Sequence, residues 1–177
     1  MRKLVPYVLI GLALLAVPAY AQFNNTGTTL LSVSVGPEAA IRIDTATTTL
    51  ATTGTTFNNP YTGITNLTYK VRSTKVGGSG SITLQVTTDF SGTGGPKVTP
   101  PPSAGDALTY PCTVSTYGCG SAQTASTTAA TNVATFGANV RSTKAGDSGS
   151  VSWSLTNDPV YETGDYTATV TFTISAA

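Results

Sequence analysis

The sequence predicts an all-β protein, an antiparallel β-sandwich of about seven to nine strands. A glycine-rich turn followed by alternating apolar residues occurs twice, and the last segment of the chain alternates without a break. After the first 21 residues, no segment has the 3.6-residue apolar period of a helix. A closed β-barrel is the main alternative arrangement of such strands.

The repeated stretch is the strongest of these signals. Residues 71–89 read VRSTKVGGSGSITLQVTTD and residues 140–158 read VRSTKAGDSGSVSWSLTND, an offset of 69 positions. A polar, glycine-rich turn beside apolar alternation is typical of a β-hairpin with one buried face. We therefore expect two equivalent hairpins, a repeated hairpin within one domain.

The final segment predicts the clearest single strand. Five apolar side chains would face the core: Tyr166, Ala168, Val170, Phe172 and Ile174. The hydroxyl side chains between them would face the other way: Thr167, Thr169, Thr171, Thr173 and Ser175. Because Phe172 should be buried in the core, its replacement by alanine should cost about 3–5 kcal/mol.

The N-terminus predicts export. Arg2 and Lys3 precede a short apolar run, Leu4 to Val17, and Ala19-Tyr20-Ala21 fits a signal-peptidase site before Gln22. We expect residues 1–21 to be a signal peptide and residues 22–177 to be one β-sandwich domain. A retained N-terminal anchor is the alternative.

The composition limits the partners of the exported chain. Without the predicted leader, seven Lys and Arg remain against eight Asp and Glu, a net charge of −1. We predict no nucleic-acid partner and no membrane span after signal cleavage. The charged fraction of 10% is low, and Thr, Ser and Gly supply the polar positions, which suits an extracellular β-protein.

Two cysteines, Cys112 and Cys119, are separated by six residues. In an exported chain we expect them to form a disulfide that closes a tight loop. A redox-active pair is the less favoured alternative, because the spacing is not C-x-x-C and no Lys, Arg or His lies nearby in sequence.

Between these landmarks the chain alternates strands and breakers. Leu31, Val33 and Val35 alternate, Gly36-Pro37 interrupts them, and Ile41 and Ile43 resume the pattern, as in a strand broken by a bulge or a switch between sheets. Residues 91–106, SGTGGPKVTPPPSAGD, exclude a central strand and predict an exposed loop.

Two motifs are similar to catalytic signatures, but each lacks the second residue that its chemistry requires. Gly146-Asp147-Ser148-Gly149 matches the serine-protease motif GDSG, but the sequence has no histidine to take the proton from Ser148. Asp44-Thr45-Ala46 is similar to an aspartic-protease loop, but no second copy supplies the other carboxylate. We predict no catalytic residue, no cofactor site and no enzyme activity.

Two further features have a functional and a structural interpretation. Asp158, Glu162 and Asp165 crowd one turn, where they would bind calcium or simply be solvated turn acids. We favour the second interpretation and predict no metal site. Trp153, the only tryptophan, could stack on a sugar, but it occupies the place of Leu84 in the first repeat and is expected in the core.

Gly164-Asp165-Tyr166 and the alternating strand after it resemble the last strand of bacterial secreted immunoglobulin-like domains. The Gly-x-Tyr spacing resembles a tyrosine corner, in which the phenol bonds to nearby backbone. The tail is also similar to chaperone–usher fimbrial subunits, with Gly164 fourteenth from the end, although Ala176 stands where those proteins have a penultimate aromatic residue. The resemblance implies an immunoglobulin-like sandwich and an exported, fimbrial-type surface protein.

Two functions follow as expectations. The first is a non-catalytic secreted, extracellular or cell-surface protein, with the periplasm as the alternative, that is structural or adhesive. Its partners would be itself or other surface proteins, joined through edge strands. The second is a secreted carbohydrate- or small-ligand-binding module that uses residues 91–106 and nearby tyrosines.

Overall fold

The structure is a computed structural model that describes residues 25–114 and 116–177. The predicted leader, residues 1–21, therefore lies outside the described residues. Contacts divide the chain into two units, one ending at Ser34 and the other spanning Val35–Ala177, and every strand belongs to the second. Among the described residues, no helix is long and apolar enough to cross a membrane.

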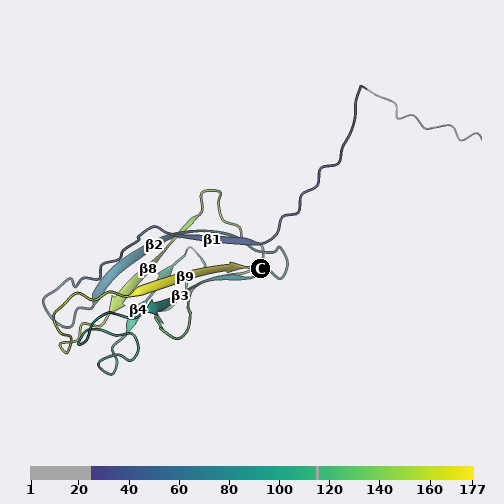
Figure 1. Cartoon of the computed structure of the whole chain (residues 1–177). Coiled ribbons are helices and arrows are strands. Elements are labelled where there is room, and N and C mark those ends of the chain that lie inside the picture. The colour runs from purple at the N-terminus through teal and green to yellow at the C-terminus, as the bar shows by residue number, and fades with distance from the viewer. Residues whose placement is uncertain (1–24, 115) are drawn as a thin grey trace, which may run out of the picture. The chain divides into compact units, whose positions relative to one another are not determined.

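The nine strands of the described residues form two antiparallel sheets. Figure 1 draws the longer strands as arrows. The larger, six-stranded sheet contains β1 (Glu38–Ile43), β2 (Tyr61–Arg72), β8 (Asp147–Leu155), β4 (Leu108–Tyr110) and β6 (Gln123–Thr124) in that order, and β5 (Cys112–Thr113) also pairs with β8. The smaller sheet has the order β7 (Thr131–Phe136), β3 (Gly80–Thr88), β9 (Thr169–Ala176). The predicted β-sandwich is confirmed, and the two sheets do not close into a barrel.

The predicted repeated hairpin is wrong. β2 pairs with β8 and β3 pairs with β7, so neither repeat folds back on itself. Each glycine-rich connection instead carries the chain from one sheet to the other. The alternation was a correct signal for strands, but periodicity does not reveal whether two successive strands pair or cross between sheets.

The strand pairing is the same in both sheets when each residue is replaced by the one 69 positions away in the other repeat. Gly80 pairs with Phe136 in the smaller sheet. The residues 69 positions away from these two, Gly149 and Leu67, pair with each other in the larger sheet. The repeats are therefore interlocked halves, and each supplies one strand to each sheet.

The shared Val-Arg-Ser sequence holds the halves together where they cross. The Ser73 amide donates to the Val140 carbonyl at 3.0 Å, and the Ser142 amide donates to the Val71 carbonyl at 2.9 Å. The serine side chains repeat the exchange: the Val140 amide donates to Ser73 Oγ at 2.9 Å, and the Val71 amide donates to Ser142 Oγ at 3.0 Å. Each copy of the motif thus binds the other copy.

The core lies between the sheets and is built from the inward-facing residues of β2, β3, β7 and β8. Leu67, Tyr69, Ile82, Leu84 and Val151 are each at most 1% exposed. In β9, Val170, Phe172 and Ile174 face inward and Thr169, Thr171 and Thr173 face outward, as the alternation predicts. These three apolar residues are only partly buried, however, so the expected full burial of Phe172 is wrong.

The apolar alternation before β1 does not form a strand. Leu31 and Val33 are 88% and 87% exposed, and β1 begins only at Glu38. Val35 is 63% exposed. The segment Thr29–Val35 thus has a strand-like sequence without a strand partner in the described chain.

Candidate functional site

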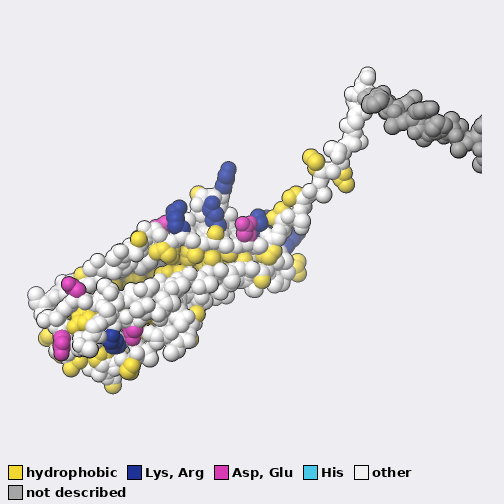
Figure 2. All heavy atoms as spheres, viewed as in Figure 1, with side chains coloured by type: hydrophobic (Ala, Val, Ile, Leu, Met, Phe, Trp, Pro, Cys, Tyr) yellow, Lys and Arg dark blue, Asp and Glu magenta, His cyan; other side chains and the backbone are white. Residues whose placement is uncertain are grey.

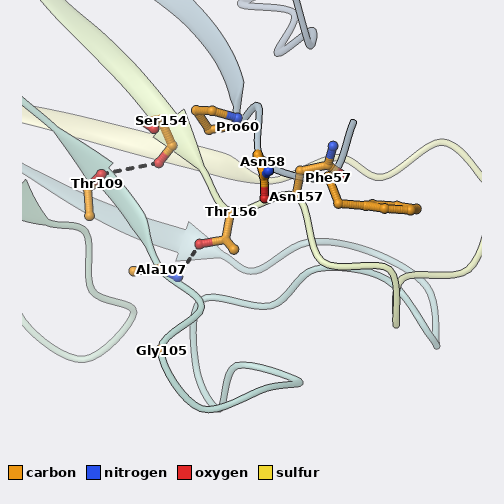
Figure 3. Close-up of a pocket in the computed structure, with 9 residues that line it drawn as sticks. All are labelled: Phe57, Asn58, Pro60, Gly105, Ala107, Thr109, Ser154, Thr156 and Asn157. Atoms are coloured by element: carbon orange, nitrogen blue, oxygen red, sulfur yellow. Dashed lines mark hydrogen bonds between the residues drawn. The ribbon is translucent and has the colours of Figure 1, made fainter. Parts of the chain in front are cut away.

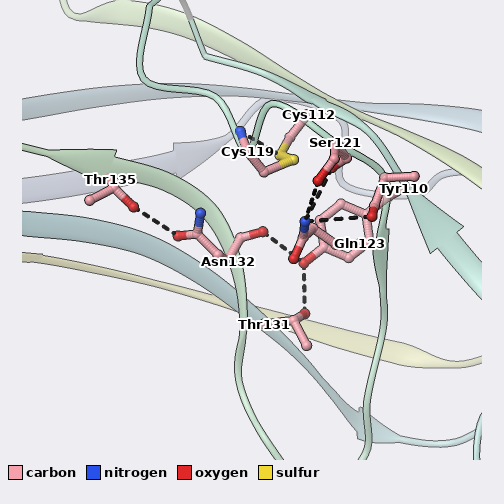
Figure 4. Close-up of a disulfide and its surroundings, with 9 residues drawn as sticks. Tyr110, Cys112, Cys119, Ser121, Gln123, Thr131, Asn132 and Thr135 are labelled. Atoms are coloured by element: carbon pink, nitrogen blue, oxygen red, sulfur yellow. Dashed lines mark hydrogen bonds between the residues drawn. A yellow bond between two sulfur atoms is a disulfide. The ribbon is translucent and has the colours of Figure 1, made fainter.

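The predicted disulfide between Cys112 and Cys119 is confirmed, with a Cα–Cα distance of 5.6 Å. Cys112 pairs with Val151 of β8 in the larger sheet, and Gly118 forms a bridge with Ala134 of β7 in the smaller sheet. The disulfide therefore closes the turn that joins the two sheets along this side of the sandwich (Figure 4).

Tyr110 reinforces the same closed side. Its hydroxyl lies 2.6 Å from Thr131 Oγ1 and 3.0 Å from the Asn132 carbonyl, so a side chain of β4 bonds to β7 of the other sheet. Burial, the larger influence, raises the Tyr110 pKa, and the hydrogen bond with Thr131 lowers it. Figure 4 shows these partners beside the disulfide.

The opposite side of the sandwich is open. In the described chain, β1 pairs only with β2 and β9 only with β3, so each strand has a free edge. The two strands lie side by side and share no ladder. Partly buried apolar residues face the gap between them, and we call this set the β1–β9 seam: Ala39, Ile41 and Ile43 from β1, and Val170, Phe172, Ile174 and Ala176 from β9.

The seam reaches the molecular surface. Figure 2 shows apolar side chains in a band between the positions of β1 and β9. The side chains next to this band on β1 are polar or small, among them Glu38 and Arg42. The band is thus an apolar surface bordered by two strand edges whose backbone groups are available for pairing.

A shallow uncharged depression of about 270 Å³ lies at one end of the strands (Figure 3). Its lining residues are Phe57, Asn58, Pro60, Gly105, Ala107, Thr109, Ser154, Thr156 and Asn157. The Ala107 amide donates to Thr156 Oγ1 at 3.2 Å, and Thr109 Oγ1 donates to the Ser154 carbonyl at 3.3 Å. Phe57 is 63% exposed and is the one aromatic residue in this lining.

Residues 91–106 form a loop without strands, as predicted, but part of the loop is packed into the molecule. Asp89, just before the loop, fixes the middle of the loop, because its carboxylate accepts hydrogen bonds from the amides of Val98 at 2.8 Å and Thr99 at 3.1 Å. Gly95 and Pro96 are buried, and a Cβ atom on Gly95 would collide with the Tyr166 ring. Only Gly105 of this loop lines the depression.

Among the described residues, neither the turn acids nor any others form a cluster of three or more Asp, Glu, Cys or His side chains placed to hold a metal ion. The pKa of Asp158 is lowered, first by a hydrogen bond from Ser103 and then by the Val160 amide. The nearby Tyr161 hydroxyl donates to Asp106 at 2.8 Å, and burial, followed by this carboxylate, raises the Tyr161 pKa.

Tyr166 forms the backbone contact that the Gly-x-Tyr spacing predicts. Its hydroxyl donates to the Glu162 carbonyl at 2.9 Å, four residues upstream. This bond fixes the chain just before β9.

The two protease-like motifs occupy structural positions. Asp147 accepts a hydrogen bond from the Thr143 amide at 3.1 Å, and Ser148 lies in β8 opposite Thr68 of β2. Asp44 accepts hydrogen bonds at 2.6 Å from both Thr68 and Arg42, which lower its pKa in that order. Trp153 is 5% exposed and donates to Thr65 at 2.8 Å, which confirms its expected place in the core.

Sequence reasoning missed the seam itself. The alternation of β1 and β9 was visible, but which strand edges stay unpaired depends on contacts between segments far apart in the chain. A usable signal was present before β1: Leu31, Val33 and Val35 alternate like a strand with one buried face.

Comparisons with protein-family models, with curated proteins and with solved structures find no match to this chain.

Proposed function

We propose that this protein is a non-catalytic, exported β-sandwich that serves as a structural or adhesive surface subunit and associates with itself through the β1–β9 seam. The observation that carries the proposal is the seam: two free strand edges beside a row of half-buried apolar side chains. Natural sandwiches usually protect such edges with charges, proline or a covering segment, because an exposed edge recruits another strand.

The outer chemistry of the strands supports a structural role. The exposed faces carry Thr and Ser, and charged residues make up only 10% of the chain. Since the sequence contains no histidine, neither Ser148 nor another hydroxyl has an imidazole base. The short disulfide loop suits an oxidising compartment, which agrees with the predicted leader and with the resemblance to fimbrial-type subunits.

Light scattering coupled to size-exclusion chromatography tests the proposal. The chain purified after removal of the predicted leader should form assemblies whose mass rises with protein concentration, and negative-stain microscopy should show their form. A chain that remains monomeric throughout the accessible concentration range would rule out self-association.

The depression in Figure 3 favours a second candidate, a binding module for a neutral carbohydrate. An exposed aromatic ring beside amide and hydroxyl groups is the combination that uncharged sugars use, through stacking and hydrogen bonding. A glycan array with the unchanged chain and with Phe57→Ala tests this candidate. Loss of a specific glycan signal in the variant would support it, and absence of any signal in both would refute it.

A further inference from the structure

The end of the sandwich where the two repeats cross is basic. Five of the seven Lys and Arg in the described chain lie there, and we call this set the basic patch: Lys70, Arg72, Lys75, Arg141 and Lys144. With Glu38 and Asp147 included, this end carries a net charge of +3. Five acidic residues lie towards the other end of the strands: Asp89, Asp106, Asp158, Glu162 and Asp165. In Figure 2 most dark blue side chains lie towards the end where β1 begins, and most magenta ones lie towards the opposite end.

Two arginines of the basic patch stand opposite each other on the outer face of the larger sheet. Arg72 and Arg141 form an antiparallel bridge, and the amide that follows each one donates to the carbonyl that precedes the other. In a pair of this kind the Cα atoms are about 4.5 Å apart and the side chains lie on the same face. Val71 and Ser73 are buried, so Arg72 between them faces outward. Like charges placed directly opposite each other destabilise a sheet, so folding alone does not explain this pair.

Carboxylates of the chain itself neutralise only part of this charge. Arg72 pairs with Glu38 at 2.9 Å. The Asp147 carboxylate accepts from the Thr143 amide at 3.1 Å. Among the described residues, four exposed cations of the patch form no ion pair: Lys70, Lys75, Arg141 and Lys144. Their charges are available to an anionic partner.

A polar groove of about 640 Å³ adjoins the basic patch. Its lining residues are Asn66, Thr113, Thr143, Gly146, Asp147, Ser148, Gly149 and Ser150. Apart from Asp147 and the two glycines, these residues present uncharged amide and hydroxyl groups. Lys144 lies between Thr143 and Gly146 in the chain, at the border of the groove. Cations and hydroxyl-bonding groups therefore lie side by side.

The connection that precedes β8 forms one wall of the groove and is held in place. Thr143 Oγ1 donates to the Gly146 carbonyl at 2.7 Å. Gly146 has a φ of +99°, and a Cβ atom there would lie 2.7 Å from Thr68 Cγ2 on the outer face of β2. The connection thus rests directly on the sheet. A wall that is already ordered avoids the entropic cost of ordering a mobile loop when a ligand binds.

We infer that the groove and the basic patch together bind an acidic polysaccharide built from uronic acid sugars. The cations would pair with the carboxylates, and the groove would bond to ring hydroxyls. A uronic acid keeps its free ring hydroxyls beside the carboxylate, whereas sulfation converts such hydroxyls into esters. A hydroxyl-bonding groove next to cations therefore favours the uronic acid. This binding goes beyond the proposed structural role and does not depend on self-association.

The acidic end of a second copy is the competing partner for the basic patch. Three of its five carboxylates already accept hydrogen bonds within the chain: Asp89 from the Val98 amide, Asp106 from the Tyr161 hydroxyl and Asp158 from the Val160 amide. A contact between oppositely charged ends would also leave the uncharged groups of the groove unused. Both observations favour the polysaccharide.

Isothermal titration calorimetry with an oligogalacturonate of defined length tests the inference, at a concentration where the exported chain is monomeric. The oligogalacturonate should bind, and an uncharged dextran of similar length should not. The affinity should fall between low and physiological ionic strength, because salt screens exposed charges. A chain that binds no oligogalacturonate at low ionic strength would overturn the inference.

Two matched lysine variants locate the binding site. Lys144→Gln removes one charge at the border of the groove and should weaken oligogalacturonate binding by about two- to fivefold. Adding Arg141→Gln should increase the loss to about tenfold. Lys97→Gln removes the same charge near the acidic end and should leave the affinity unchanged, while circular dichroism checks that each variant is folded. An equal loss in the Lys144 and Lys97 variants would contradict the assigned site.

The groove itself is tested by Asn66→Ala combined with Ser148→Ala, which changes no charge. This variant should bind oligogalacturonate more weakly but bind dextran sulfate, a ligand held by charge, as well as the unchanged chain does. Equal binding of oligogalacturonate to the variant and the unchanged chain would mean that charge alone attracts the ligand, and the uronic acid assignment would fail.

Light scattering separates this inference from the proposed self-association. A chain that stays monomeric and binds oligogalacturonate would refute self-association and support the inference. If Lys144→Gln abolishes assembly and the unchanged chain binds no oligogalacturonate, the partner of the basic patch is a second copy and the inference fails.

Discussion

At the scale of single residues, two buried tyrosines should respond differently to the loss of their hydroxyl groups. Among the described residues, the Tyr69 hydroxyl is buried without a hydrogen-bond partner, whereas the Tyr110 hydroxyl has two partners. Tyr69→Phe should leave the free energy of unfolding within about 1 kcal/mol of its original value or raise it, because it removes an unsatisfied group. Tyr110→Phe should lower it by about 1–2 kcal/mol. Urea denaturation of both variants measures the difference, and an equal loss in both would contradict this account.

The same side chains predict how stability depends on pH. The pKa values of Tyr69, Tyr110 and Tyr161 are raised chiefly by burial, so the folded state favours the protonated phenol. In the unfolded chain a tyrosine loses its proton near pH 10. The stabilisation is therefore complete below about pH 10 and is lost as the pH rises further, towards the raised pKa values of the folded state.

Thermal unfolding followed by circular dichroism between pH 7 and pH 11 checks this dependence. The melting temperature should fall above about pH 10, and Tyr161→Phe should reduce the fall. A melting temperature that rises through this range would show that the phenols are stabilised as phenolates instead.

At the scale of elements, the crossing of the two repeats should depend on its serines. Ser73 is 5% exposed, accepts from the Val140 amide and donates to the Gly137 carbonyl at 2.7 Å. Ser73→Ala should lower the free energy of unfolding by about 1–3 kcal/mol, since it leaves a backbone amide without its partner. Ser79→Ala, at an exposed position in the same connection, is the matched control and should change little.

In the last strand, the free-energy cost of truncating a side chain should depend on how completely that side chain is buried. Phe172 is only partly buried, so Phe172→Ala in the monomeric chain should cost about 1–2 kcal/mol, less than the 3–5 kcal/mol of a fully enclosed phenylalanine. Phe136, 1% exposed, provides that reference. Denaturation at a concentration where the chain is monomeric compares them, and an equal cost at both positions would show that the seam is closed.

The elements also show what the sequence could predict. Side-chain alternation is a local property, so the faces of β8 and β9 were correct and Trp153 was correctly placed in the core. Strand pairing is not local. The glycine-rich connections support a hairpin or a crossing equally well, and only contacts between residues 69 positions apart distinguish the two. The repeated serines were a missed signal, because identical motifs can bind each other.

At the scale of the whole molecule, the sandwich has one side closed by a covalent bond and one side left open. The disulfide and Tyr110 join the sheets on the first side, and the β1–β9 seam lies on the second. Removing the bond with Cys112→Ser and Cys119→Ser should lower the free energy of unfolding by about 2–3 kcal/mol, because the closed loop is short. Denaturation should still be cooperative, and a chain that no longer folds would mean that the disulfide does more than close this turn.

The disulfide between these cysteines could be predicted from the sequence, because their spacing and the predicted export of the chain are enough for that inference. The seam could not be predicted from the sequence, because it exists where β9, in the described chain, lacks the neighbour that β6 provides to β4. That asymmetry becomes visible only after the two repeats are seen to interlock.

Amide hydrogen exchange measured at low and high protein concentration tests the central claim most directly. If a second copy covers the open side, amides on the free edge of β9 and in Thr29–Val35 should exchange more slowly at high concentration. Amides of β4, which β6 already covers, should exchange at the same rate at both concentrations. The contradicting result would be amide exchange in β9 and Thr29–Val35 that does not change with concentration, in a sample that light scattering shows to be assembled. This side would then not be the assembly surface.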